Sequence, residues 1–183
     1  MNEINNAATA SEAAVIRGGR MAEQAIATGR YTVECRDAQG DLKWSEDIEN
    51  IVVTEGKNLA LDVFLGGSAA PAWYLGLVNG ATTPTFAAAD TMASHAGWTE
   101  SAAYAAATRP APTWSAAATG SKSTTTVSYA INATATIAGV FLATNSTKSG
   151  TTGTLYSAGA FTTGGTKTVG DGDTLNVTYT GSL

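Results

Sequence analysis

Apolar residues recur at two different intervals in this sequence, and the change of interval divides the chain. In residues 9–28 they recur every three to four positions, the spacing that places side chains on one face of a helix. From residue 30 onwards apolar residues mostly alternate with polar ones, the spacing of a strand with one buried face. The pattern therefore predicts an N-terminal helical segment, residues 1–29, followed by a mainly β domain, residues 30–183.

The N-terminal segment predicts a helix that needs a surface to pack on. Thr9 followed by Glu12 fits a capping box, in which each side chain accepts a hydrogen bond from a free amide of the first turn. The apolar stripe is thin, and the glycines at 18–19 cost about 1 kcal/mol each relative to alanine, so this helix is marginal alone. It either docks on its own domain or is an arm that orders against another subunit. The side chains expected at that contact are Val15, Ile16, Ala22 and Ile26.

The start of the β domain predicts a hairpin and then a short helix. Alternation through residues 31–35 and 42–53, with the Asp37–Gly40 turn between them, is typical of two antiparallel strands. Thr54 is placed to cap a helix that runs to about Leu65, where a pair of glycines ends it. The side chains of this helix that are available for burial are Ala60, Leu61, Phe64 and Leu65.

The remainder of the chain predicts strands joined by polar turns. Residues 73–78 form an apolar run suited to a central strand, and Asp90 is placed to cap a short helix through His95. Later strands are expected over residues 126–134, 136–143, 154–162 and 174–180. Short strands at this spacing favour an antiparallel β-sandwich or jelly-roll-like domain, with an N-terminal helical arm and one or two short helices.

Charge is scarce and unevenly distributed. Charged residues make up 14% of the chain, the formal net charge is −5, and 19 of the 25 charges lie in residues 1–100. Nucleic-acid binding through phosphates needs clustered lysine and arginine, which this sequence lacks, so no nucleic-acid partner is expected. The sequence also has no apolar run of the length that spans a membrane, and its first residues do not resemble a secretory signal. We therefore expect folding in a cytoplasm.

Residue types that carry catalysis are few. The chain has one cysteine, Cys35, on the apolar face of the predicted hairpin, and one histidine, His95. A Ser94–His95–Asp90 set would have to be assembled by the fold, because adjacency in sequence does not supply the geometry of a triad. The interpretation that we favour is a core thiol and a loop histidine. The chain is thus predicted not to be an enzyme.

Two acidic clusters are candidate binding sites. Asp171 and Asp173 flank a glycine and could bind a hard cation, but calcium takes six to eight oxygen ligands, so a turn with solvated carboxylates is favoured. Glu46, Asp47 and Glu49 could act in acid–base chemistry only if one were desolvated, and a solvated strand face is favoured. No metal and no cofactor are expected.

The tryptophans offer an alternative, carbohydrate-binding interpretation. Trp44 and Trp73 lie in strand patterns and are expected in the core. Trp98 and Trp114 lie in loop-rich segments, where exposed rings could stack on a sugar. These two residues are the candidates for ligand stacking.

Several short segments of the β domain resemble a family of small virion structural proteins of tailed bacteriophages. The segments that carry the resemblance are Ile51–Asn58, Trp73–Leu77, Asp90–Trp98, Thr108–Pro110, Thr151–Gly159 and Gly172–Val177. The resemblance covers roughly residues 30–183 and supplies no catalytic residues.

The resemblance implies a virion protein that is assembled in the bacterial cytoplasm. Such a protein is either an adaptor that attaches fibres at the neck or tail, or a capsid decoration protein, and we favour the adaptor. Its partners would be other virion proteins, namely the portal or tail adaptor, a fibre, or the major capsid protein. The resemblance also implies a homo-oligomer, with a trimer as the expected state. A receptor- or glycan-binding fibre module is the remaining alternative.

Overall fold

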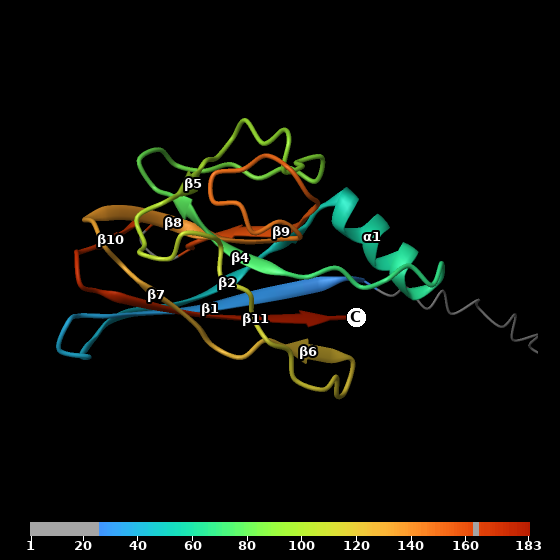
Figure 1. The fold of residues 1–183 in the computed structure, drawn as a ribbon, viewed down its shortest axis with the longest axis horizontal. Coiled ribbons are helices and arrows are strands. Elements are labelled where there is room, and N and C mark those ends of the chain that lie inside the picture. The colour runs from blue at the N-terminus through green and yellow to red at the C-terminus, as the bar shows by residue number, and fades with distance from the viewer. Residues whose placement is uncertain (1–25, 163–164) are drawn as a thin grey trace, which may run out of the picture.

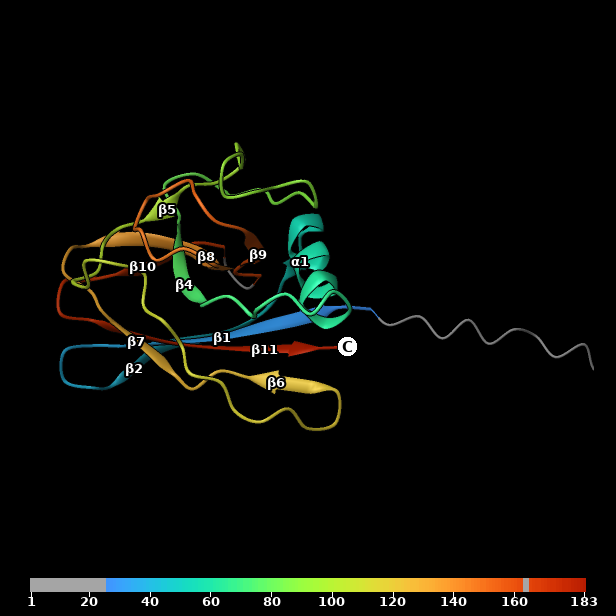
Figure 2. The same ribbon diagram turned by 45° about the vertical axis from the view of Figure 1, so that its right-hand side comes forward.

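The computed structural model of the chain describes residues 26–162 and 165–183, which form two antiparallel sheets that face each other (Figures 1 and 2). The predicted mainly β chain with antiparallel sheets is therefore confirmed. The helix predicted over residues 9–28 lies almost entirely outside the described residues. At its end, Ile26 and Ala27 are not helical and Thr28 already belongs to the first strand.

The first sheet forms the lower layer of the molecule in Figure 1, and its two longest strands lie side by side. Its members are β1 (Thr28–Arg36), β2 (Leu42–Glu49), β6 (Ser121–Ser123), β7 (Val127–Ala130) and β11 (Thr174–Ser182). The strand order is β2–β1–β11–β6, and β7 also pairs with β11. Tyr31, Val33 and Cys35 are fully buried while their polar neighbours point outwards, as the period of two predicts.

The second sheet is buried on both faces over much of its area. Its members are β3 (Ile51–Val52), β4 (Tyr74–Asn79), β5 (Glu100–Ser101), β8 (Ala135–Ala143), β9 (Leu155–Ala160) and β10 (Lys167–Val169). The order is β3–β9–β8–β4–β5, and β10 pairs with β8. The main core covers one face, and Met92 and Trp98 from the loops cover the other. This double burial explains why residues 137–143 are apolar or glycine at every position.

The chain changes sheets at Asn50. Strands β1 and β2 form the predicted antiparallel hairpin, and the Asp37 carboxylate accepts hydrogen bonds from the amides of Gln39 and Asp41 in its turn. Ile51 and Val52 were expected to continue the return strand, but they pair with β9 of the second sheet. The hairpin prediction is thus correct as far as Glu49 and wrong beyond it.

Helix α1 (Thr54–Phe64) follows β3 and lies at one end of the two sheets, beside the last residues of β11 (Figures 1 and 2). The helix was predicted nearly to the residue. Its N-cap, however, is Val53 rather than Thr54, and no side chain caps the first turn.

The structure differs from the sequence prediction in two other places. The short helix expected from Asp90 to His95 is a pair of turns with an isolated bridge between Thr91 and Ser94. The short strands β5, β6 and β10 were not anticipated, because two or three residues are too few to show a period.

Candidate binding surface at the α1 end of the sheets

Helix α1 is held against β9 by close backbone contacts. The amide of Val53 donates to the carbonyl of Tyr156 at 3.0 Å, and the Glu55 carboxylate accepts a hydrogen bond from the amide of Leu155 at 2.5 Å. Gly56 is buried, and a Cβ at this position would lie 2.4 Å from the Tyr156 carbonyl oxygen. The first turn of α1 is therefore fixed to the sheet, and the rest of the helix projects beyond it.

The projecting helix forms one wall of an open groove of about 580 Å³ at the end of the two sheets. From α1 the groove takes Leu59, Ala60 and Val63, and its other apolar lining residues are Ala70, Pro71, Trp73, Trp114, Ala117, Leu142, Tyr156, Tyr179 and Leu183. Trp73 packs edge-on against Tyr156 and Trp114 edge-on against Tyr179, with ring centroids 5.2 and 6.1 Å apart. The aromatic rings come from four different segments that only the fold brings together.

The apolar surface continues from the groove onto the solvent side of α1. Leu61, Phe64 and Leu65 were expected to be buried, but they are 54%, 84% and 73% exposed. Phe64 lies one helical turn after Ala60 in the groove wall, so its side chain extends that wall along the helix. We call the groove together with Leu61, Phe64 and Leu65 the apolar end. An apolar surface of this kind marks an interaction site more often than a free surface.

The charge at the apolar end is sparse. Asp62 is exposed among the apolar side chains of α1, and no basic residue stands in the last turn of the helix. The C-terminus of a helix carries a partial negative charge, to which Asp62 adds. Lys122 is among the residues that line the groove. A partner at α1 would therefore be favoured by positive charge.

The predicted ligand-stacking residues do not lie together. Trp114 is half-buried in the groove. Trp98 is only 3% exposed and packs against Phe141, in the apolar cluster on the outer face of the second sheet that also contains Met92. Trp98 was a candidate for exposure because its segment lacks a strand pattern, but that segment folds over the second sheet. Of the predicted arm residues, Ile26 is exposed and Val15, Ile16 and Ala22 lie outside the described residues.

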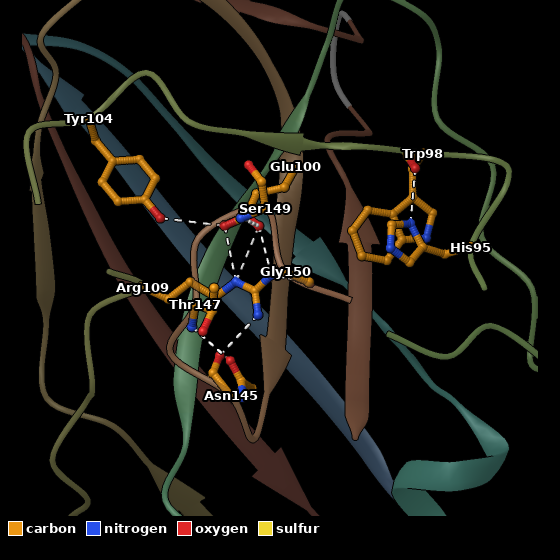
Figure 3. Close-up of polar contacts among 9 residues, drawn as sticks. All are labelled: His95, Trp98, Glu100, Tyr104, Arg109, Asn145, Thr147, Ser149 and Gly150. Carbon is orange, nitrogen blue, oxygen red and sulfur yellow. Dashed lines mark hydrogen bonds and ion pairs between the residues drawn. The ribbon is translucent and has the colours of Figure 1, made fainter. Parts of the chain in front are cut away.

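A buried ion pair joins β5 to the loop that follows it (Figure 3). Arg109 and Glu100 have side chains that are 1% and 5% exposed, and both Nε and Nη2 of the arginine donate to the carboxylate. The guanidinium also donates to the carbonyls of Asn145 and Gly150, and the Ser149 amide donates to Glu100. Both charged groups are thus hydrogen-bonded to partners within the protein. The cluster ties the segment around Arg109 to the loop of residues 145–150.

The side chain of His95 is also held by contacts within the protein (Figure 3). Its ring stacks on Trp98 at 4.0 Å between centroids, and its Nδ1 lies 3.0 Å from the Trp98 carbonyl oxygen, to which it donates. The Asp90 carboxylate accepts from the indole of Trp98 and not from the histidine. The Ser94–His95–Asp90 set is therefore not assembled.

Two acidic side chains predicted to be solvated are buried. Asp173 is 5% exposed and pairs with Lys43 at 2.5 Å, and Glu46 is 7% exposed and pairs with Lys167 at 2.7 Å. Strand alternation places Glu46 on the same buried face as Ile48, so the solvated face predicted for Glu46 is wrong. Burial tends to raise the pKa of Asp173, but hydrogen bonds from the Gly170 amide and Lys43 outweigh it, and the pKa lies below its ordinary value.

The remaining reactive group is equally unavailable. Cys35 is fully buried, and burial together with the negative charge of Asp173 raises the pKa of its thiol to about 11. Because the thiolate is the nucleophile, this thiol is unsuited to covalent catalysis at neutral pH. Over residues 26–162 and 165–183, no group of three or more His, Cys, Asp and Glu side chains is placed to hold a metal ion.

In the same described ranges, the structure contains no helix with the length and apolar character needed to cross a bilayer. No known protein family, curated protein or solved structure matches the chain.

Proposed function

We propose that this protein is a non-enzymatic structural component of a tailed-bacteriophage virion, an adaptor that attaches fibres at the neck or tail. In this proposal the two-sheet body is a β-sandwich of the jelly-roll-like kind, and the N-terminal segment is an attachment arm. The protein assembles as a homo-oligomer in the bacterial cytoplasm and contacts the portal or tail adaptor, a fibre, or the major capsid protein.

The observation that carries the proposal is the apolar end. Phe64 and Leu65 are more exposed than large apolar side chains of a free soluble domain usually are, and they adjoin an aromatic-lined groove. Burying each such side chain contributes roughly 1.5–3 kcal/mol. A protein that functions inside a permanent assembly can bury this surface there. The sequence resemblance supports the virion as that assembly.

The buried polar clusters give the proposal further support. Arg109 and Cys35 are buried, and His95 is half-buried and stacked on Trp98, so all three side chains are held in contacts that stabilise the body. The aromatic rings around Trp114 favour the glycan-binding alternative in one respect, because sugars stack on such rings. Sugar hydroxyls also require several polar partners, and the groove offers few, with Ser121, Lys122 and Ser182 among them.

Cryo-electron microscopy of purified particles tests the proposal. The adaptor role requires density for this fold at the neck or tail, in the copy number of that ring. Density spread over the capsid surface would support the decoration role instead, and absence from purified particles would refute both. A Leu61→Asp, Phe64→Asp variant should be incorporated far less than a Leu42→Asp variant, whose exposed leucine lies near the β1–β2 turn at the opposite end (Figure 1).

Glycan binding is tested separately on a glycan array. The adaptor proposal expects no binding by the unaltered protein. Binding that is lost in Trp114→Ala while the thermal unfolding midpoint is retained would favour the fibre-module alternative.

A further inference from the structure

The two edges of the first sheet differ in how they are protected against pairing with another chain. One edge is β2, which carries four charged residues, Lys43, Glu46, Asp47 and Glu49. Glu46 lies on the buried face of the strand, where it pairs with Lys167 at 2.7 Å. Charges on an edge strand, and inward-pointing ones above all, oppose the addition of a further strand. The β2 edge is therefore protected.

The opposite edge, formed by residues 113–117 beside β6, has no such protection. Trp114 stands opposite Thr124 in an antiparallel bridge, and backbone hydrogen bonds on either side of the bridge join residues 113 and 115 to the strand that contains β6. Trp114 is thus a non-hydrogen-bonded member of this ladder, and its own N–H and C=O point away from β6. Within residues 26–162 and 165–183, neither Trp114 nor Ala116 makes a backbone hydrogen bond. This edge is uncharged and its backbone is free to pair.

The groove lies on one face of this free edge. Trp114 and Lys122 both line the groove, and Lys122 pairs with Gly181, two positions after Tyr179 on the same face of β11. Successive side chains of a strand point to opposite faces of a sheet. Every second side chain of a strand added at residues 113–117 would therefore point to the groove side, where aromatic rings form the lining.

The charge in the groove selects the chemistry of that strand. Lys122 is the one charged side chain of the described residues that line the groove. In the described part of the chain, no carboxylate lies within ion-pair distance of its ammonium group. A positive charge on a binding surface favours a partner of opposite charge. An apolar strand that carries a carboxylate therefore complements this groove.

Two other occupants fit less well. A helix satisfies its backbone groups internally, so it would leave the N–H and C=O of Trp114 unused. A second copy that paired through the same edge would bring residues 111–120, which contain no acidic residue, and would leave Lys122 without a counter-charge. The free backbone and the charge together favour an extended segment of another protein.

We infer that the edge at residues 113–117 pairs with an extended segment of a partner protein, which places apolar side chains in the groove and a carboxylate beside Lys122. In strand addition, main-chain hydrogen bonds supply affinity and pockets for alternate side chains supply specificity. This inference rests on the proposed role as an assembly component, because it describes the partner segment that the apolar end binds, but it does not depend on the virion.

Two short peptides, blocked at both ends, serve as probes. In both of them valine alternates with threonine, and one central valine is replaced by glutamate in the first peptide and by glutamine in the second. Amide shifts of the nitrogen-15-labelled full-length protein give the binding site and the dissociation constant. The glutamate peptide should shift the amides of Trp114 and Ala116 and the indole signal of Trp73. It should bind about tenfold more tightly than the glutamine peptide.

Lys122→Met tests the charge pairing. This variant should bind the glutamate peptide about tenfold more weakly and the glutamine peptide as before, since only the first peptide uses the ammonium group. A general structural defect would instead weaken the binding of both peptides.

Ala116→Pro tests the pairing of the backbone. Proline removes the N–H at this exposed position of the free edge, so binding of both peptides should be lost. Ala116→Ser keeps the N–H and is the matched control, which should bind both peptides like the unaltered protein. The thermal unfolding midpoint verifies that all three variants fold.

Three results would overturn the inference. The first is the absence of shifts at Trp114 and Ala116 with either peptide at about 1 mM, because main-chain pairing does not depend on a particular partner sequence. The second is a set of shifts confined to Leu61 and Phe64, which would indicate that α1 binds side chains without strand pairing. The third is shifts at the edge on concentrating the protein alone, which would make a second copy the occupant. The virion role is decided separately by the particle maps, so a protein found at the neck that binds neither peptide would refute the inference alone.

Discussion

At the scale of single residues, buried charge is the feature that the sequence pattern conveys least. Arg109 and Glu100 stand in segments with no periodicity, and nothing in their spacing of nine residues distinguishes them from two solvated side chains. The fold brings them to 2.7 Å and removes both from water. Burial of Cys35, by contrast, was predicted correctly, because it alternates with polar neighbours on a strand.

The Arg109–Glu100 pair should be the most sensitive polar site for stability. Arg109→Met leaves the Glu100 carboxylate buried without its counter-charge, which should lower the free energy of unfolding by about 3–5 kcal/mol. Urea denaturation followed by tryptophan fluorescence measures this loss. Replacing both residues with apolar ones should cost much less than Arg109→Met alone, since no buried charge is then unpaired.

The control for this prediction is Arg36→Met. Arg36 pairs with Glu34 at 3.3 Å, and both side chains are about 40% exposed. Loss of an exposed pair should change the free energy of unfolding by less than about 1 kcal/mol. Equal losses in the Arg109 and Arg36 variants would show that the buried network does not stabilise the loops.

At the scale of elements, helix α1 shows what propensity rules predict and what they leave out. Its extent follows from Thr54 at the start and the glycine pair at the end, both visible in the sequence, although Thr54 does not cap the first turn. Its orientation does not, because Leu61 and Phe64 have the character of buried residues and are exposed. The helix is anchored instead through Gly56, whose missing side chain allows close approach to β9.

Gly56→Ala should therefore destabilise the protein, against the usual preference. Alanine is ordinarily favoured over glycine in a helix by about 1 kcal/mol. Here the added Cβ meets the backbone of Tyr156, which cannot move without the sheet, so we expect a loss of roughly 1–3 kcal/mol in urea denaturation. Lys57→Ala, at the exposed neighbouring position, should be neutral within about 0.5 kcal/mol. A Gly56→Ala protein as stable as the original would mean that α1 is not packed as described.

At the scale of the whole molecule, strands were easier to predict than their partners. Alternation located β1, β2 and β11 closely, because each is long enough to show its period, and a continuous apolar run located β8. It could not show that the chain crosses to the second sheet at Asn50, since Ile51 and Val52 are too few residues to show a period of their own. The groove was missed for the same reason: Trp73, Trp114, Tyr156 and Tyr179 are far apart in sequence, and only the sheet pairing gathers them.

The contact between β2 and the turn before β11 makes the stability of the whole molecule depend on pH. Asp173, in the turn before β11, accepts hydrogen bonds from Lys43 on β2 and from the Gly170 amide. Its pKa lies below its ordinary value because these hydrogen bonds outweigh the effect of burial. A carboxyl with a lowered pKa in the folded state stabilises the fold above its unfolded pKa of about 3.9. That contribution disappears as the pH falls through the folded pKa.

Urea denaturation of the unaltered chain and of Asp173→Asn between pH 7 and pH 3 tests this linkage. At pH 7 the variant should be less stable by roughly 1–3 kcal/mol, because Lys43 and the Gly170 amide lose a charged acceptor. Below about pH 4 the difference should shrink, since the unaltered Asp173 becomes protonated as well. Asp171→Asn, on the exposed side of the same turn, should show no such convergence. A stability difference that stays constant from pH 7 to pH 3 would mean that Asp173 acts through its shape and hydrogen bonds alone, and that its charge does not hold β2 to the start of β11.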